Sequence, residues 1–160
     1  MVVLLMGTTG AGKTTVGKIL AARLRWTFLD ADDFHSPANI DKMHHGIPLT
    51  DADRLPWLGK IHSELQRQTQ SGKNIVLACS ALKQCYRDLL SRELDTRIVY
   101  LRGTYGVMRQ RIEFRHGHFA GEDILAGQFA DLEEPPNALA LDVSRSPQQL
   151  AAEVISSLHL

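Results

Sequence analysis

Two stretches near the N-terminus carry residue types that suit phosphate chemistry. The first, GTTGAGKT, runs from Gly7 to Thr14 and fits the pattern GxxxxGK[ST]. Its glycines let backbone N–H groups turn towards phosphate oxygens, and a helix that opens behind them adds partial positive charge. The final lysine suits β- and γ-phosphates, and the hydroxyl after it suits Mg²⁺. The predicted nucleotide-phosphate site comprises Gly7, Thr8, Thr9, Gly10, Ala11, Gly12, Lys13, Thr14 and Thr15.

The second stretch, FLDADDFH at residues 28–35, places three carboxylates directly after an apolar run. If the strand stays extended past Phe28, its period of two puts Asp30 and Asp32 on one side. Phosphoryl transfer needs a metal ligand and a group that receives the proton of the acceptor hydroxyl. We assign Asp30 to Mg²⁺, together with Thr14, and Asp32 to the base. Solvated loop acids, or caps for the next helix, are the alternative.

A phosphate loop does not by itself name a reaction. The guanine-reading pattern Asn/Thr-Lys-x-Asp is absent, and no DxxG follows a strand. The apolar run NIVLAC at 74–79 leads into Ser80 rather than into an acid. A GTPase is therefore not favoured, and the carboxylate for the metal must come from the DADD stretch.

Apolar runs that alternate with helical patterns predict the elements that position these residues. Strands are expected at 1–6, 26–31, 74–79, 97–101 and 138–143. Helices are expected after the Gly-rich turn, after capping signals at Thr50 and Ser146, from Ser80, from about Thr104 and at 124–132. This alternation predicts an α/β fold with three layers and a five-stranded parallel sheet.

Two segments interrupt the alternation, at about 35–70 and about 115–130. Ligands of such sheets bind at the carboxyl ends of the strands. We therefore expect a helical substrate-binding insertion in the first segment and a lid in the second. Both would belong to one domain spanning residues 1–160.

Composition limits the partners. The 160 residues contain 18 Lys+Arg and 18 Asp+Glu, so no global basic field favours nucleic acid or anionic lipid. No stretch approaches the ~20 apolar residues of a membrane span. Cys79 and Cys85 form no CxxC pattern, which is typical of a reduced cytoplasmic compartment. We therefore expect a cytoplasmic protein without nucleic-acid or membrane partners.

Over nearly its whole length the chain resembles the gluconate kinases, small P-loop enzymes of the group that includes shikimate and nucleoside-monophosphate kinases. The segments that carry the resemblance are MGTTGAGKTTVG, FLDADDFHSPANIDKM, GIPLTDADRLPWL, LACSALKQCYRDLL, FRHGHF and QFADLEEP. The resemblance implies a P-loop kinase fold and transfer of phosphate from Mg²⁺-bound ATP to the 6-hydroxyl of D-gluconate. It also implies a homodimer.

The substrate suggested by this resemblance, a linear polyol acid, needs a cation for its carboxylate. Arg54 is our candidate, because a guanidinium offers two parallel donors. An Asp–Arg pair with Asp51 or Asp53 is the alternative. The other expected substrate contacts, besides Asp32, are His35, Ser80, Ala81, Lys83, Arg87, His118 and Gln128.

The lid segment is expected to supply arginines. By resemblance, Arg111 would lie near the adenine, and Arg115 would reach the transferring phosphate and complete a catalytic set with Lys13 and Asp32. We assign nothing to the region after Asp131. Neither the pair His116 and His118 nor the pair at 44–45 has the thiolates or acids expected of a zinc site.

Two other functions fit parts of the sequence. One is a kinase for another small acceptor, such as a shikimate-like acid or a nucleoside monophosphate. The other is an ATP-binding sensor without catalysis. A sensor has no need of a base such as Asp32 or of a lid arginine such as Arg115, so we prefer the kinase.

Overall fold

A five-stranded sheet forms the centre of the computed structural model, which describes residues 1–116 and 122–160; the side chains of 115, 116 and 122 are also outside the description. All strand pairs are parallel, in the order β2-β3-β1-β4-β5. The strands are β1 (Val2–Met6), β2 (Thr27–Asp30), β3 (Ile75–Ala78), β4 (Thr96–Arg102) and β5 (Leu139–Asp142). The predicted parallel sheet is confirmed.

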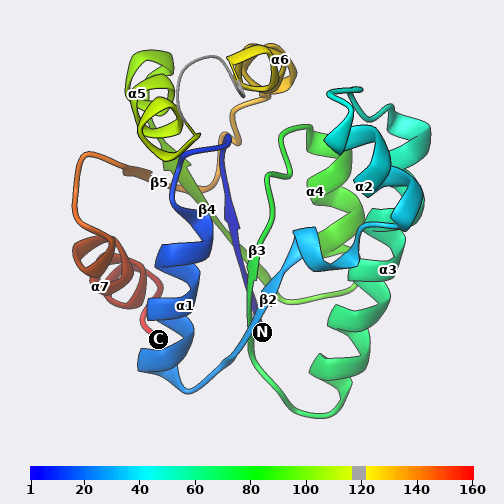
Figure 1. Ribbon diagram of the computed structural model, residues 1–160. Helices are drawn as coiled ribbons and strands as arrows, with labels where there is room; N and C mark the ends of the chain where they lie inside the picture. The colour runs from blue at the N-terminus through cyan, green and yellow to red at the C-terminus, as the bar shows by residue number, and fades with distance from the viewer. Residues whose placement is uncertain (117–121) are drawn as a thin grey trace.

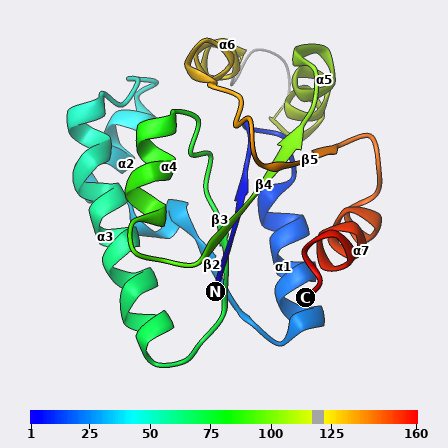
Figure 2. The same cartoon turned by 180° about the vertical axis from the view of Figure 1, so that it is seen from behind.

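Helices cover both faces of the sheet and its upper edge. The helices are α1 (Lys13–Leu24), α2 (Pro37–His44), α3 (Asp51–Gln70), α4 (Gln84–Ser91), α5 (Tyr105–His116), α6 (Glu122–Asp131), α7 (Pro147–Leu158) and a 3₁₀ turn, η1 (Ala31–Phe34). Figure 1 shows α1 and α7 on one face and α3 and α4 on the other, with α5 and α6 above the carboxyl ends of the strands. Figure 2 shows the same layers from behind. Both termini lie towards the end of the molecule that is opposite to α5 and α6.

The central strand β1 is buried on both faces, as its continuous apolar run predicts. Val3 and Leu5 join the core under α1 and α7, whereas Val2, Leu4 and Met6 join the core under α3 and α4. All five residues are at most 1% exposed. This alternation confirms the predicted three layers and holds the end of β1 rigidly beneath the phosphate loop.

The predicted capping signals form as expected. Thr50 and Asp53 make reciprocal bonds that begin α3, and Ser146 and Gln149 do the same for α7. Asp53 also accepts two hydrogen bonds from Lys42 of α2, at 2.8 and 2.9 Å. This contact ties the two helices of the insertion together.

The expectation of a helix from Ser80 is wrong, because α4 begins at Gln84 with Lys83 as its N-cap. Ala81 has φ +42°, in the left-handed region, so the chain cannot continue as a right-handed helix there. The turn places Lys83 at the N-cap, ahead of the first residue of the helix. No helix in the described ranges is long and apolar enough to cross a membrane.

Candidate active site

The predicted phosphate residues form one continuous turn between β1 and α1. Gly7, Gly10 and Gly12 have φ values of +146°, +81° and +91°, which side chains other than hydrogen rarely allow. A Cβ on Gly7 would also lie 2.7 Å from the carbonyl oxygen of Leu101. The glycines therefore permit a backbone shape in which N–H groups can converge on an anion.

Lys13, at the start of α1, folds back over this turn. Its Nζ donates to the carbonyl oxygens of Gly7 and Thr8, each at 3.0 Å. Burial lowers the pKa of Lys13, and the nearby carboxylates of Asp32 and Asp30 oppose that effect. The hydrogen-bond partners of this ammonium are neutral carbonyl oxygens, and a bound phosphate would give it a negatively charged partner.

Asp30 and Thr14 lie together, as predicted. The Thr14 hydroxyl donates to Oδ2 of Asp30 at 2.8 Å, and Oδ1 of Asp30 accepts from the backbone N–H of Asp32 at 3.2 Å. The expected reason for their position is wrong, however, because β2 ends at Asp30 and the chain turns into η1 instead of staying extended. Asp30 is itself the cap of this turn.

These two oxygen donors fit Mg²⁺, which prefers hard oxygen ligands and usually binds through one or two protein groups together with phosphates and water. Within residues 1–116 and 122–160, no group of three or more His, Cys, Asp or Glu side chains could hold a metal by itself. A pair such as Thr14 and Asp30 suits a metal whose other ligands are phosphate oxygens and water.

Asp32 is the open carboxylate of the turn. Its side chain is 88% exposed, and Oδ1 lies 4.0 Å from Nε2 of His35. Desolvation by the surrounding protein and the charge of Asp30 raise the pKa of the Asp32 carboxyl, while Lys13 and His35 lower it. At this exposure water screens much of the effect, but its direction favours acceptance of a proton.

His35 is held behind this carboxylate rather than in the open. Its side chain is 6% exposed and stacks on Trp57, with ring centroids 4.3 Å apart. The Trp57 indole N–H donates to the carbonyl oxygen of Ala31 at 2.7 Å, so Trp57 packs the insertion onto η1. Burial lowers the pKa of His35. The imidazole therefore supports η1, and only its Nε2 edge approaches Asp32.

Arg54 of α3 stands in a cluster of charges. Its Nη1 lies 3.3 Å from the Tyr86 hydroxyl, 3.6 Å from Oδ2 of Asp131 and 3.8 Å from Oδ1 of Asp51. Lys83 binds Asp51 at 3.0 Å. The Asp–Arg pair with Asp51, the alternative to a substrate contact, is therefore present, but it is long and shares Arg54 with two other oxygens.

The loop after β3 runs beside the phosphate turn, since the N–H of Gly7 donates to the carbonyl oxygen of Ser80 at 3.4 Å. Arg87 holds this loop from inside: it is 1% exposed and donates to the carbonyls of Ala81 and Leu82 and to the side chain of Gln84. The structure buries Arg87, which was expected to contact substrate, and its hydrogen bonds go to this loop. Its guanidinium stabilises the left-handed turn at Ala81.

Helices α5 and α6 close the upper edge of the site. Gln128 of α6 accepts from the Thr9 N–H at 2.6 Å. Arg111 donates to the carbonyl oxygens of Gly10 and Val143 at 3.3 and 2.5 Å. It borders a cavity of about 460 Å³ that reaches the phosphate turn and is also lined by Gly12, Thr15, Phe114, Val143, Pro147 and Leu150. The volume of this cavity lies within the range of small-molecule pockets.

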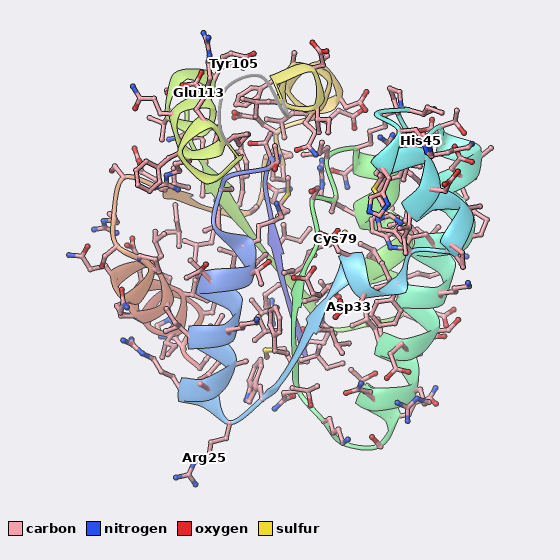
Figure 3. All side chains as sticks on the ribbon, viewed as in Figure 1. Arg25, Asp33, His45, Cys79, Tyr105 and Glu113 are labelled. Atoms are coloured by element: carbon pink, nitrogen blue, oxygen red, sulfur yellow. The ribbon has the colours of Figure 1, made fainter. Side chains whose placement is uncertain are left out.

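Figure 3 shows the two sides of the site at the carboxyl ends of the strands. Tyr105 and Glu113 of α5 lie on one side, and His45, the residue that follows α2 in the sequence, lies on the other. Cys79, at the end of β3, lies between them. Burial raises the pKa of the Cys79 thiol to about 12, so it is a neutral packing group. The predicted roles of the Arg115 side chain and of His118 fall outside the described residues.

The sequence did not single out several residues that the structure places in this region. Tyr86, Asp131 and Glu133 link α3 and α4 to the last residue of α6 and to the segment that follows it. Glu133 donates its N–H to Leu82 at 3.0 Å and accepts from the N–H of Gln84 at 2.5 Å. The region after Asp131 was left unassigned, although its acids in ADLEEP were a visible signal.

Comparison with known proteins gives a consistent result. The family model described as shikimate kinase matches residues 9–123. A probable gluconokinase of Rattus norvegicus is 40% identical, over 98% of this chain and 97% of its own. The thermoresistant gluconokinase of Escherichia coli K12 is 38% identical, over 94% and 89%. A crystal structure of a gluconokinase from Sinorhizobium meliloti 1021 matches with TM-score 0.88 and 36% identity, covering 98% of this chain and 90% of that one.

Proposed function

The chain belongs to the gluconokinases, within the shikimate kinase family, and on this premise we propose that it transfers the γ-phosphoryl group of ATP to the 6-hydroxyl of D-gluconate. One structural observation carries the proposal. A phosphate turn with Lys13, an open carboxylate at Asp32 and an arginine at position 54 gather at the same edge of the sheet. This edge thus offers a group for each end of a linear sugar acid.

The phosphate end of the site would be held by the turn and by Lys13, whose ammonium neutralises charge on the β- and γ-phosphates. Thr14 and Asp30 would hold Mg²⁺. When bound, the ion would neutralise phosphate oxygens and keep them aligned. The Arg111 cavity would receive the adenine.

The acceptor end would be organised by Asp32 and Arg54. Arg54 binds the gluconate carboxylate, which orients the chain so that its far hydroxyl reaches the phosphate turn. Asp32 takes the proton of that hydroxyl as the oxygen forms its bond to the γ-phosphorus and the bond to the β-phosphate oxygen breaks, releasing ADP. Aligning the two reactants supplies much of the rate enhancement.

Family membership also supports the finer expectations. We propose a single kinase domain at residues 1–160, a lid at about 115–130 with Arg115 and His118, a homodimer and a cytoplasmic location. The contact between Gln128 and the Thr9 N–H supports the lid assignment, because it links α6 to the phosphate turn. Size-exclusion chromatography with light scattering tests the dimer, and a monomer at micromolar concentration would refute it.

An ADP-release assay with Mg-ATP tests the reaction. Purified protein is given D-gluconate, shikimate, a nucleoside monophosphate or no acceptor. We expect release that depends on gluconate and exceeds the acceptor-free rate by at least about a hundredfold, because a bound and aligned hydroxyl reacts faster than water. Release that depends on another acceptor would overturn the substrate assignment, and nucleotide binding without turnover would favour the sensor.

A further inference from the structure

Arg54 is held by one side of its guanidinium. The hydrogen bond and ion pairs of its guanidinium within residues 1–116 and 122–160 all use Nη1, and they reach Tyr86, Asp131 and Asp51. The Nε and Nη2 donors on the other edge are therefore available in this part of the structure. A carboxylate binds a guanidinium best through two parallel hydrogen bonds along one edge. Arg54 is fixed on one side and can bind an anion on the other.

Tyr86 of α4 is the centre of this support. It is 5% exposed, accepts from Arg54 at 3.3 Å, and donates its own O–H to Oδ1 of Asp51. Its ring also lies beneath two cations, with the Arg54 Cζ 5.9 Å and the Lys83 Nζ 5.7 Å from the ring centroid. A cation over an aromatic face within about 6 Å is attracted to it. Tyr86 therefore contacts Arg54 through both its hydroxyl and its ring.

The charge of the cluster shows why a neutral hydroxyl suits this place. Arg54 and Lys83 carry two positive charges, and Asp51 and Asp131 carry two negative ones. A third acid beside Arg54 would make the cluster net negative and repel an acceptor carboxylate. Burial, followed by the hydrogen bond to Asp51, raises the pKa of Tyr86, so the phenol stays neutral. It holds the guanidinium without adding charge.

We propose that Tyr86 is a positioning residue for acceptor specificity: it fixes Arg54 so that the Nε–Nη2 edge is preorganised for the carboxylate of the sugar acid. This inference rests on the proposed function, since it names the support of the same acceptor site. Preorganisation lowers the entropy lost when the carboxylate binds. Tyr86 thus favours acceptors with a carboxylate over uncharged polyols of equal length.

The test variant is Tyr86→Phe, which removes the hydroxyl and keeps the ring. The matched control is Tyr100→Phe: Tyr100 is 3% exposed, belongs to the same core and donates to Glu134 at 3.3 Å, but has no contact with Arg54. We expect the KM for D-gluconate to rise about tenfold in Tyr86→Phe, the usual scale for a lost hydrogen bond to a charged group. The KM for ATP should stay unchanged, and the control should match the wild type in both.

A double-mutant cycle with Arg54→Ala separates positioning from a general structural role. If Tyr86 acts through Arg54, adding Tyr86→Phe to Arg54→Ala raises the KM for gluconate no further. Equal fold-changes in both backgrounds, or an unchanged KM in the single variant, would overturn the inference. A second readout is the rise in Tm that gluconate causes relative to each variant's own ligand-free Tm, which stays measurable in a destabilised variant.

The outcomes distinguish the two proposals. Wild-type enzyme without gluconate turnover overturns the proposed function and this inference together. Wild-type enzyme with gluconate turnover, but with Tyr86→Phe behaving like Tyr100→Phe, overturns only the role of Tyr86.

Discussion

Replacing Asp32 with asparagine removes a carboxylate while keeping its size and shape. The turn that carries it should persist, because η1 is capped by the Asp30 side chain bonding the backbone N–H of Asp32, not by the Asp32 side chain. The Asp32 side chain is 88% exposed, and exposed substitutions of this kind usually change stability by less than about 0.5 kcal/mol. Loss of activity in this variant would therefore report on chemistry.

The expected loss follows from the role of the group. A positioned general base contributes roughly 10²–10⁴ in rate. Asp32 is open to water, so in the variant a water molecule can accept the proton in its place. We therefore expect a loss in the lower half of this range, a fall in kcat of about 10²–10³, or about 2.7–4 kcal/mol. The KM values for ATP and gluconate should change by less than about threefold, because neither the phosphate turn nor Arg54 is altered.

The assay is steady-state ADP release at saturating Mg-ATP and gluconate, with Asp33→Asn as the matched control from the same turn. Asp33 is also exposed and should tolerate the change. The pH profile gives a second reading. A base acts when deprotonated, so kcat/KM falls as pH falls through its pKa, and the raised pKa of Asp32 moves this limb above that of an ordinary aspartate. Near-normal kcat in Asp32→Asn, with the acid limb retained, would refute the assignment.

Three further substitutions test the contact of Arg54 with the substrate carboxylate, the link between the helices of the insertion, and the packing of the core. Arg54→Ala should raise the KM for gluconate by at least about a hundredfold, since two charge-assisted hydrogen bonds are lost, and leave the KM for ATP unchanged; equal effects on both would contradict a carboxylate clamp. Asp53, whose pKa is lowered to about 2 chiefly by its hydrogen bonds to Lys42, stabilises the fold above its unfolded pKa near 3.8. That contribution should disappear as pH falls from about 4 to about 2, so Asp53→Asn should flatten this part of the plot of Tm against pH, and an unchanged slope would count against it. Gly17→Ala would place a Cβ 2.6 Å from Cε2 of Phe28. Overpacking should lower the free energy of unfolding by about 1–3 kcal/mol and outweigh the helix-propensity gain of about 1 kcal/mol. An undiminished midpoint of urea unfolding would show that the core adapts to the added methyl group.

Local signals predicted much of this fold. The continuous apolar run of β1 required burial on both faces, and the capping pattern at Thr50 required a helix start. The phosphate turn was predicted because its glycines need positive φ and its lysine and threonine need a fixed spacing. These features depend on residues close together in the sequence, so the sequence displays them directly.

The features that could not be predicted depend on contacts between distant segments. The turn at Ala81 is stabilised by Arg87, and nothing in CSALK marks the left-handed residue in advance. The support of Arg54 comes from Tyr86 on another helix and from Asp131, the last residue of α6. The end of β2 at Asp30 was missed because a run of acids fits both an extended strand and a capped turn.

The position of the transferred phosphate tests the central claim most directly. If Arg54 holds the carboxylate while the far end of the acceptor meets the phosphate turn, D-gluconate must be phosphorylated on the carbon farthest from its carboxylate. ³¹P and ¹³C NMR of the product mixture after complete turnover should show a single phosphate ester at carbon 6, with the phosphorus coupled to carbon 6 and, through it, to carbon 5. A phosphate on any other carbon, or no phosphorylated sugar acid, would contradict the account.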